Sequence, residues 1–296
     1  MIETKDTVSE ALRNLIARNS TRLTRADERL LEVLTQDPVR AAIDNGAAVS
    51  SRAGVHPASA VRLARRLGFS GYPEFRTFIQ SSLIAGGGDL DSPAARMAAR
   101  LVKADDGGVL SSILDSEIAA LEQVRQRVSG GDIRRFAECI RESRRVFVFG
   151  RGHFASLSAL VTLRLNRSGY PCVDLGSHMH QLPEVLSQMT RKDTLWLFSF
   201  RRSVPVLNEI RAIAHSAKAT TMAITDLKGV LISPPPDHHI AVSRGAVGES
   251  QSLVVPMTIA NAIILDLASI DEGHSIRSLE RFKAFRTQSG LSRSLT

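Results

Sequence analysis

From Arg144 onward, short β-rich runs alternate with stretches long enough to hold a helix. The runs are Arg145–Phe149, Pro171–Leu175, Thr194–Phe200, Ala219–Thr225 and His239–Val242. Strands separated by helix-length connections are typical of βαβ units, in which the strands are parallel and the crossovers right-handed. This half of the chain is therefore predicted to form a doubly wound α/β domain with a parallel sheet.

The first 85 residues follow a different pattern, with apolar residues at helical spacing and no convincing strand. Thr24 and Asp27 have the spacing of a capping box at a helix start. The segment Gly86–Pro93 contains three glycines, two aspartates and a proline, which a helix tolerates poorly. We therefore predict two domains joined by a linker. The all-α domain covers residues 1–85, the linker 86–110, the α/β domain 111–286, and a tail follows over 287–296.

Composition limits the class of protein. The 296 residues include only two cysteines, which excludes a disulfide framework and fits a reducing compartment. There is no apolar run of 18 residues and no signal-peptide pattern, so a cytoplasmic protein without a membrane partner is expected.

The net charge is +8, from 38 Lys and Arg against 30 Asp and Glu, which is compatible with binding to nucleic acid or to a small anion. The histidines lack zinc-ligand spacing, so neither a metal nor another cofactor is expected.

The segment Val49–Gly68 has the pattern of a helix-turn-helix. Gly54 suits a tight interhelical turn, and Pro57 suits the first position of the helix that follows. An apolar stripe on that helix faces the core, and the outward face carries small residues and arginines that fit a major groove. The candidate DNA-binding residues are Arg52, His56, Ser59, Arg62, Arg65, Arg66 and Arg76. Among them, Arg62→Ala and Arg66→Ala are expected to weaken DNA binding and leave the fold intact.

This N-terminal region resembles the RpiR family of bacterial transcription regulators. Four segments carry the resemblance: Leu23–Thr24, Ala53–Val55, Val61–Tyr72 and Glu74–Arg76. The third of them ends in the string Leu67-Gly68-Phe69-Ser70-Gly71-Tyr72. The sequence departs from the family at His56, where a capping serine is usual. We therefore expect a weaker cap at the start of the recognition helix.

In the second domain, Gly150-Arg151-Gly152-His153 follows the first predicted strand and opens a helix. Glycines in such a turn let backbone N–H groups approach an anion at the helix N-terminus. Two interpretations compete. Gly150-x-Gly152-x-x-Ala155 followed by Asp174 resembles a dinucleotide fingerprint, which implies a redox-sensing regulator. The other interpretation is the sugar isomerase (SIS) domain that RpiR regulators carry at this place, and the resemblance spans Arg144–Ile270.

The SIS resemblance implies an effector site. Its candidate residues are Gly150, Arg151, Gly152, His153, Ser199, Arg201, Arg202, Ser203, Glu249 and Ser250. The sequence departs from the family after the third strand, where Arg201 and Arg202 replace small residues. A forked guanidinium binds phosphate or carboxylate in two places, although one or both arginines could instead be structural. The expected ligand is a small anionic, sugar-related metabolite, either a sugar phosphate or a sugar acid.

These observations predict a ligand-responsive transcription regulator that binds double-stranded operator DNA. Glu249 is the one obvious candidate base for isomerase chemistry, and an ordinary helix-terminal carboxylate is favoured, so no catalytic residue is assigned. A sugar-phosphate isomerase with an accessory helical domain is the alternative. A homodimer or homotetramer is expected, with the apolar segment Leu253–Ile270 and the helix near Ser111–Val128 as candidate contact surfaces.

Overall fold

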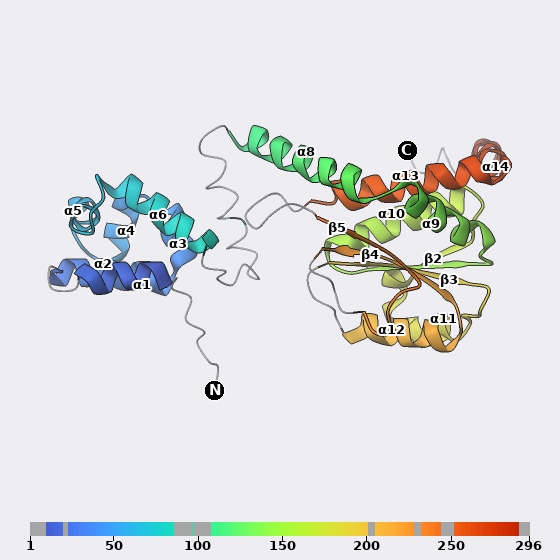
Figure 1. Ribbon diagram of the computed structural model, residues 1–296, viewed down its shortest axis with the longest axis horizontal. Coiled ribbons are helices and arrows are strands. Elements are labelled where there is room, and N and C mark those ends of the chain that lie inside the picture. Colours follow the sequence, from blue (N-terminus) through green and yellow to red (C-terminus); the bar gives the residue numbers. More distant parts are fainter. Residues whose placement is uncertain are drawn as a thin grey trace. The chain divides into compact units, whose positions relative to one another are not determined.

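The computed structural model describes residues 10–19, 23–85, 97, 108–200, 205–227, 232–243 and 252–289. These residues form two compact units (Figure 1), one extending to Ser116 and the other starting at Glu117. The division falls within a single helix, α8 (Val109–Arg127). Each unit is described by itself.

The first unit is helical, as predicted. Its helices are α1 (Glu10–Asn19), α2 (Arg25–Gln36), α3 (Pro38–Ile43), α4 (Gly46–Arg52), α5 (Ala58–Arg66) and α6 (Tyr72–Ala85). Leucine and aromatic side chains from these helices meet in one core, in which Leu30, Leu63 and Phe75 have no exposed surface. The expected stripe on α5 is confirmed, because Ala60, Leu63 and Ala64 are buried.

The start of α2 also agrees with the sequence. The Thr24 side chain accepts a hydrogen bond from the Asp27 N–H, and the Asp27 carboxylate accepts from the Thr24 N–H at 2.8 Å. This reciprocal pair is a capping box, which satisfies backbone donors that the first turn of a helix leaves unpaired.

The second unit is built on a five-stranded sheet in which every pair of neighbouring strands is parallel. The strands are β1 (Val146–Gly150), β2 (Cys172–Asp174), β3 (Thr194–Ser199), β4 (Thr220–Asp226) and β5 (His238–Val242). Their order across the sheet is β2-β1-β3-β4-β5. The predicted doubly wound fold is therefore confirmed. The central strands β1 and β3 are buried along their whole length, as expected for a sheet covered on both faces.

Helices cover both faces of this sheet (Figure 1). One face packs against α9 (Gly130–Glu142), α10 (His153–Arg167), α13 (Val254–Ile270) and the second half of α8. The other packs against α11 (Leu182–Leu186) and α12 (Pro205–Ser216). A 3-10 segment (Leu175–Gln181) links β2 to α11, and α14 (His274–Gln288) follows α13 and contacts α10 and α13.

The position of α13 corrects one expectation. The sequence suggested the apolar segment Leu253–Ile270 as a contact surface between subunits. Seven of its residues are instead buried in the core of this unit, including Val255, Ile259 and Ile263. Its apolar character is explained by packing within the chain, and Leu265, with 67% of its surface exposed, is an exception.

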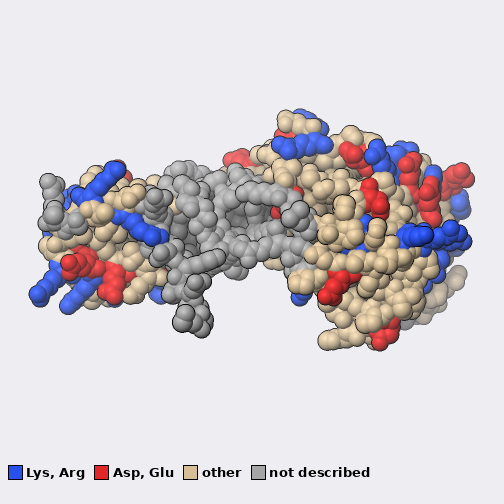
Figure 2. Space-filling model, turned by 60° about the horizontal axis from the view of Figure 1, so that its bottom comes forward, with Lys and Arg blue, Asp and Glu red and all other residues tan. Residues whose placement is uncertain are grey.

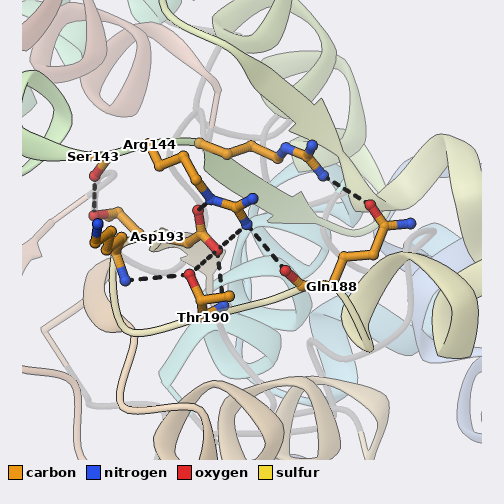
Figure 3. Close-up of polar contacts among 8 residues, drawn as sticks. Ser143, Arg144, Gln188, Thr190 and Asp193 are labelled. Atoms are coloured by element: carbon orange, nitrogen blue, oxygen red, sulfur yellow. Dashed lines mark hydrogen bonds and ion pairs between the residues drawn. The ribbon is translucent and has the colours of Figure 1, made fainter.

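A buried carboxylate joins the starts of β1 and β3. The Asp193 side chain has no exposed surface, and Arg144 donates to both of its oxygens at 2.9 and 2.7 Å (Figure 3). The Thr190 N–H and hydroxyl donate to the same carboxylate at 2.8 and 2.9 Å. Arg144 also donates to the Gln188 carbonyl. These contacts hold the sheet at the edge where its strands begin.

Within the described ranges, no single helix is long and apolar enough to span a bilayer. The pair α13 and α14, bent by 101°, meets the length and composition criteria only when the two helices are taken together.

Candidate functional site

Two regions carry the residues singled out in the sequence. The first is the α4–turn–α5 segment. At the end of α4 the Gly54 N–H donates to the Ser51 carbonyl at 3.1 Å, and the Val55 N–H donates to the Ser50 carbonyl at 3.0 Å. This is a Schellman motif, which needs a left-handed residue at Gly54, where φ is +63°. The predicted glycine turn is therefore confirmed.

The start of α5 has one side-chain contact that the sequence did not indicate. His56 Nδ1 accepts a hydrogen bond from the Ala58 N–H at 3.2 Å. This contact comes from the residue before the N-cap; the N-cap itself, Pro57, makes no side-chain hydrogen bond, which agrees with the expectation of a weaker cap. The buried Ser50 hydroxyl donates to the Pro57 carbonyl at 3.2 Å, which ties α4 to the start of α5.

The outward face of α5 is smaller than predicted. Arg62 and Arg65 are exposed, as is His56 just before the helix. Ser59 was expected on this face but is only 4% exposed, and its hydroxyl accepts from Arg62 at 2.9 Å. Ser59 therefore lies on the buried side of the helix and holds Arg62 by one of its amino groups.

Two other predicted arginines pair with acids of the same unit. Arg66 donates to the buried Asp27 carboxylate of α2 and, at 3.3 Å, to the Thr24 hydroxyl. Arg52 pairs with Asp44 at 2.7 Å. Both side chains are partly exposed, with 33% and 24% of their surface accessible. These long-range pairs fix the ends of α4 and α5.

The last predicted arginine, Arg76, is half-buried on α6. Figure 2 shows basic side chains at several places on the helical unit, with acidic groups between some of them. Of the predicted arginines, Arg62 and Arg65 are thus the two that are exposed, and Arg65 also donates to the Ser70 carbonyl at 3.3 Å.

The second region is the edge of the sheet where the strands end. Gly150 at the end of β1 lies opposite Phe198 of β3, so the turn after β1 and the residue Ser199 lie side by side. Arg151, Gly152 and His153 in that turn are exposed, whereas Ser199 is buried. The structure therefore brings together the described members of the predicted effector site.

Gly150 and Gly152 are needed for different reasons. A Cβ at Gly150 would lie 2.4 Å from the Phe154 carbonyl oxygen, so only glycine lets the first turn of α10 approach β1. Gly152 has φ of +60° and forms the N-cap of α10 without a side-chain bond. From the sequence, both glycines are expected to admit an anion. At Gly150 the close approach is made by the Phe154 backbone instead, and an anion at Gly152 stays a prediction.

Two further contacts shape this edge. The rings of Phe154 and Phe200 stack at 4.2 Å between centroids, which fastens the start of α10 to the end of β3. On the next strand the Thr225 hydroxyl lies 2.7 Å from His239 Nε2, and burial lowers the pKa of His239. The hydroxyls of Ser199 and Thr225 thus end neighbouring strands, at positions that lie opposite each other.

The remaining predicted effector residues, Arg201, Arg202, Ser203, Glu249 and Ser250, lie outside the described residues.

Asp174 bears on the dinucleotide alternative, which needs this carboxylate for a ribose. Asp174 Oδ1 instead accepts hydrogen bonds from the Ser158 hydroxyl at 2.7 Å and from the Gly176 N–H at 3.0 Å. The carboxylate caps the 3-10 segment and joins it to α10. This structural role accounts for the acid at the end of β2 without a cofactor. Among the described residues, no group of three or more His, Cys, Asp or Glu could hold a metal ion.

Two family models match the chain, in the order in which the two units occur. Residues 10–86 match the helix-turn-helix domain of the rpiR family, and residues 139–265 match the SIS domain. The chain belongs to the RpiR family. Its members of this type combine a helix-turn-helix domain with an SIS domain, and the chain is a transcription regulator of this class.

Curated relatives of this RpiR-family chain carry the same assignment. The transcriptional regulator HexR of Pseudomonas aeruginosa is 28% identical over 152 residues, a match that covers half of each chain. HexR of Escherichia coli is 22% identical over 263 residues, covering 88% of this chain and 86% of the relative. An uncharacterized helix-turn-helix regulator of Haemophilus influenzae is also 22% identical, covering 83% and 84% of the two chains.

Solved structures show the same fold. The sugar isomerase domain of an RpiR transcription factor from Sphaerobacter thermophilus has a TM-score of 0.53 at 20% identity. It covers 59% of this chain and 98% of its own. The NanR protein of Vibrio vulnificus, complexed with ManNAc-6P, also has a TM-score of 0.53, at 13% identity, and covers 91% of this chain and 97% of its own.

Proposed function

We propose that this RpiR-family regulator reads operator DNA with α5 and that the strand-end edge of its SIS domain binds a small anionic, sugar-related metabolite. The observation that carries the DNA part is the α4–turn–α5 geometry. A Schellman turn and a slim helix present Arg62 and Arg65 outward, and a recognition helix of this kind enters the major groove. Arginine suits both phosphates and guanine edges.

The DNA part is tested with substitutions on the exposed face. Arg62→Ala and Arg65→Ala should each weaken binding to a specific duplex, because each removes a contact to a phosphate or a base edge. A lost base contact costs about 1–3 kcal/mol, which is roughly five- to 150-fold in affinity. Arg29→Ala, an exposed arginine on α2, is the matched control and should leave affinity unchanged. Wild-type binding by both α5 variants would refute the assignment of the recognition helix.

The effector part is supported by the turn after β1. An uncapped helix start at Gly152, with exposed Arg151 and His153 beside it and a hydroxyl at Ser199, suits an anion. Vibrio NanR, which has the same fold, is complexed with a phosphorylated amino sugar. In the sequence, Arg201 and Arg202 come shortly after the end of β3, and a guanidinium group suits phosphate or carboxylate.

A displacement screen tests the effector part. Sugar phosphates, sugar acids and NADH are added to the protein–DNA complex, and the release or tightening of the DNA is followed. A sugar phosphate or sugar acid should change DNA affinity, and Arg202→Ala should abolish this response while leaving DNA binding by the free protein unchanged. Arg191→Ala, at the opposite edge of the sheet, is the control. A response to NADH alone would favour the dinucleotide alternative, and turnover of a phosphosugar would favour an isomerase.

We also propose that the protein acts as a dimer. Dimeric helix-turn-helix regulators read two half-sites, and a ligand then changes affinity by altering how the two DNA-binding domains are placed.

A further inference from the structure

The sheet unit buries one arginine under α12. Arg211 belongs to the buried side of this helix, together with Leu207, Ile210 and Ala214. The helix covers the face of the sheet opposite α9, α10 and α13 (Figure 1). Only 2% of the surface of Arg211 is exposed. Arginine is almost never fully buried unless it is paired, so the partners of this guanidinium need to be identified.

Two of the three guanidinium nitrogen atoms have no acceptor. Arg211 Nη2 donates to the Pro235 carbonyl at 2.6 Å. By contrast, Nε and Nη1 are buried and have no hydrogen-bond partner in the described part of the chain. A buried donor that is left unpaired destabilises the fold, and the cost is greatest for a charged group. An acceptor for Nε and Nη1 is therefore expected at this place.

The charge of Arg211 also needs a counterion. In the ranges that the structure covers, the acid whose charge acts on Arg211 is Asp237, and the two form no ion pair. Asp237 Oδ2 instead accepts from the Thr221 N–H at 2.7 Å. Burial lowers the pKa of Arg211, and the charge of Asp237 offsets part of this effect. Because the ordinary pKa of a guanidinium is above about 12, Arg211 stays protonated at neutral pH.

A buried hydroxyl lies on the same face of the sheet. Thr221 follows the start of β4, and its side chain points to the same side as Ala223, because side chains alternate along a strand. That side packs against α12. Thr221 has no exposed surface, and its hydroxyl has no partner among the residues that the structure describes. A guanidinium that can only donate and a hydroxyl that can donate thus lie in one layer.

We propose that the Arg211 guanidinium and the Thr221 hydroxyl hold a small monovalent inorganic anion, of the size of chloride, under α12. Water would satisfy the unpaired donors but would leave the buried charge uncompensated, whereas an anion does both. Because both groups are buried, the layer does not admit a bulky organic anion.

The site is separate from the strand-end edge proposed for the effector. Thr221 lies at the start of β4, and the Pro235 carbonyl that Arg211 binds directly precedes β5. The anion would therefore fasten the segment Ile232–Asp237 to α12. Ser233 and Pro235 of this segment are exposed, so the cover of the site is itself at the surface, and an anion can enter when the segment moves aside.

Urea unfolding of the full chain tests the site in solution. Chloride is replaced stepwise by gluconate, which is too large to be enclosed, at fixed ionic strength. Trp196 is the one tryptophan of the chain and is fully buried in the sheet unit, so its fluorescence follows the unfolding of this unit. An anion that binds only the folded state should lower the unfolding equilibrium constant by up to about tenfold for each tenfold rise in chloride above its dissociation constant.

Four variants separate this site from a general salt effect. Arg211→Met removes the charge but keeps the length of the side chain, and it should abolish the chloride response, since an apolar residue in place of a buried charge is often tolerated. Thr221→Val should weaken chloride binding roughly tenfold or more, because it removes a donor to an ion. Asp237→Asn should keep the response. Arg135→Met, at an exposed arginine of α9, is the matched control and should respond like wild type.

Crystals of the wild-type chain grown in bromide give a measurement that needs no variant, because anomalous scattering identifies bromide. A bromide ion within hydrogen-bond distance of Arg211 Nε or Nη1 is expected. Ordered water there, or Asp237 turned onto the guanidinium, would overturn the proposal. So would equal chloride dependence of wild type and Arg211→Met. A bromide peak without any chloride dependence in solution would show an adventitious ion only. The proposed DNA and effector binding does not depend on these outcomes.

Discussion

Each unit contains a buried aspartate held by an arginine from a distant part of the chain. In the sheet unit Asp193 is fully buried, and burial alone would raise its pKa. The hydrogen bonds from Arg144 and Thr190 outweigh burial and hold the pKa of Asp193 below its usual value. A carboxylate whose pKa is lowered by folding stabilises the protein above its unfolded pKa, and this contribution is lost as the pH falls through the folded pKa.

Replacing this carboxylate should change both the stability and its pH dependence. Asp193→Asn removes the ion pair and is expected to lower the free energy of unfolding at pH 7 by about 1–3 kcal/mol. The decline in stability below pH ~4, near the unfolded pKa of aspartate, should become shallower. Urea unfolding at a series of pH values measures both effects, with Glu184→Gln, an exposed carboxylate, as control. An unchanged pH profile would show that Asp193 does not contribute.

In the helical unit, replacing Arg66 should change the stability of the fold. The sequence-based expectation was that Arg66→Ala would leave the fold intact. Since Arg66 pairs with Asp27, whose side chain is 2% exposed, its removal leaves a buried carboxylate without its cation. We expect Arg66→Ala to lower stability by about 1–3 kcal/mol, because the Thr24 bonds remain. Arg65→Ala, at an exposed neighbour, should change stability by less than about 0.5 kcal/mol. Equal melting temperatures for the two variants would contradict this account.

At the scale of elements, local patterns predicted most of the fold. The five β-rich runs became five strands within a residue or two of their expected ends, and the glycine turn before α5 formed as expected. Both features depend on neighbours in sequence, namely short apolar runs and a residue that accepts positive φ. The helices α9 and α14 were not predicted. For α9 the signal was present and overlooked, because a capping box at Ser129 and Asp132 precedes an apolar stripe that ends at Ile140. By contrast, α14 is mostly exposed and has no such stripe.

Contacts between distant residues could not be read from spacing. Arg66 and Asp27 are 39 positions apart, and nothing local marks them as partners. The burial of Ser59 was missed because its small polar side chain gives no signal of which face it occupies. Likewise, Gly150 was assigned to an anion because a glycine after a strand permits several close approaches. Only the position of α10 shows that the approaching group is the Phe154 backbone.

The strand–turn–helix element after β1 provides a direct test of that packing. Gly150→Ala places a methyl group 2.4 Å from the Phe154 carbonyl oxygen, and the resulting shift should cost about 1–3 kcal/mol of stability. Gly130→Ala in the first turn of α9 is the matched control, because a Cβ there meets no described atom within 4 Å. Thermal unfolding compares them, and a Gly150→Ala protein as stable as the control would show that β1 and α10 are not in close contact.

At the scale of the whole molecule, the chain joins a helix-turn-helix unit to an SIS unit, for which we propose DNA reading and ligand binding. A ligand can change DNA affinity only if the two DNA-binding states of the protein bind it differently. The sheet unit meets this requirement if the anion at the end of β1 and β3 alters helices that lead to the second subunit. Since α10 begins at that edge and contacts α14, it links the proposed ligand site to α14.

Fluorescence anisotropy at fixed physiological salt tests the central claim most directly. The wild-type chain is titrated against DNA from upstream of its own gene and against a scrambled duplex of equal length. Salt is fixed because contacts to phosphates dominate affinity. The account predicts that the native fragment binds ~10³-fold or more tightly than the scrambled duplex. Equal, weak binding to both duplexes, and to a tiled set covering the neighbouring genes, would contradict the claim that α5 reads a specific operator.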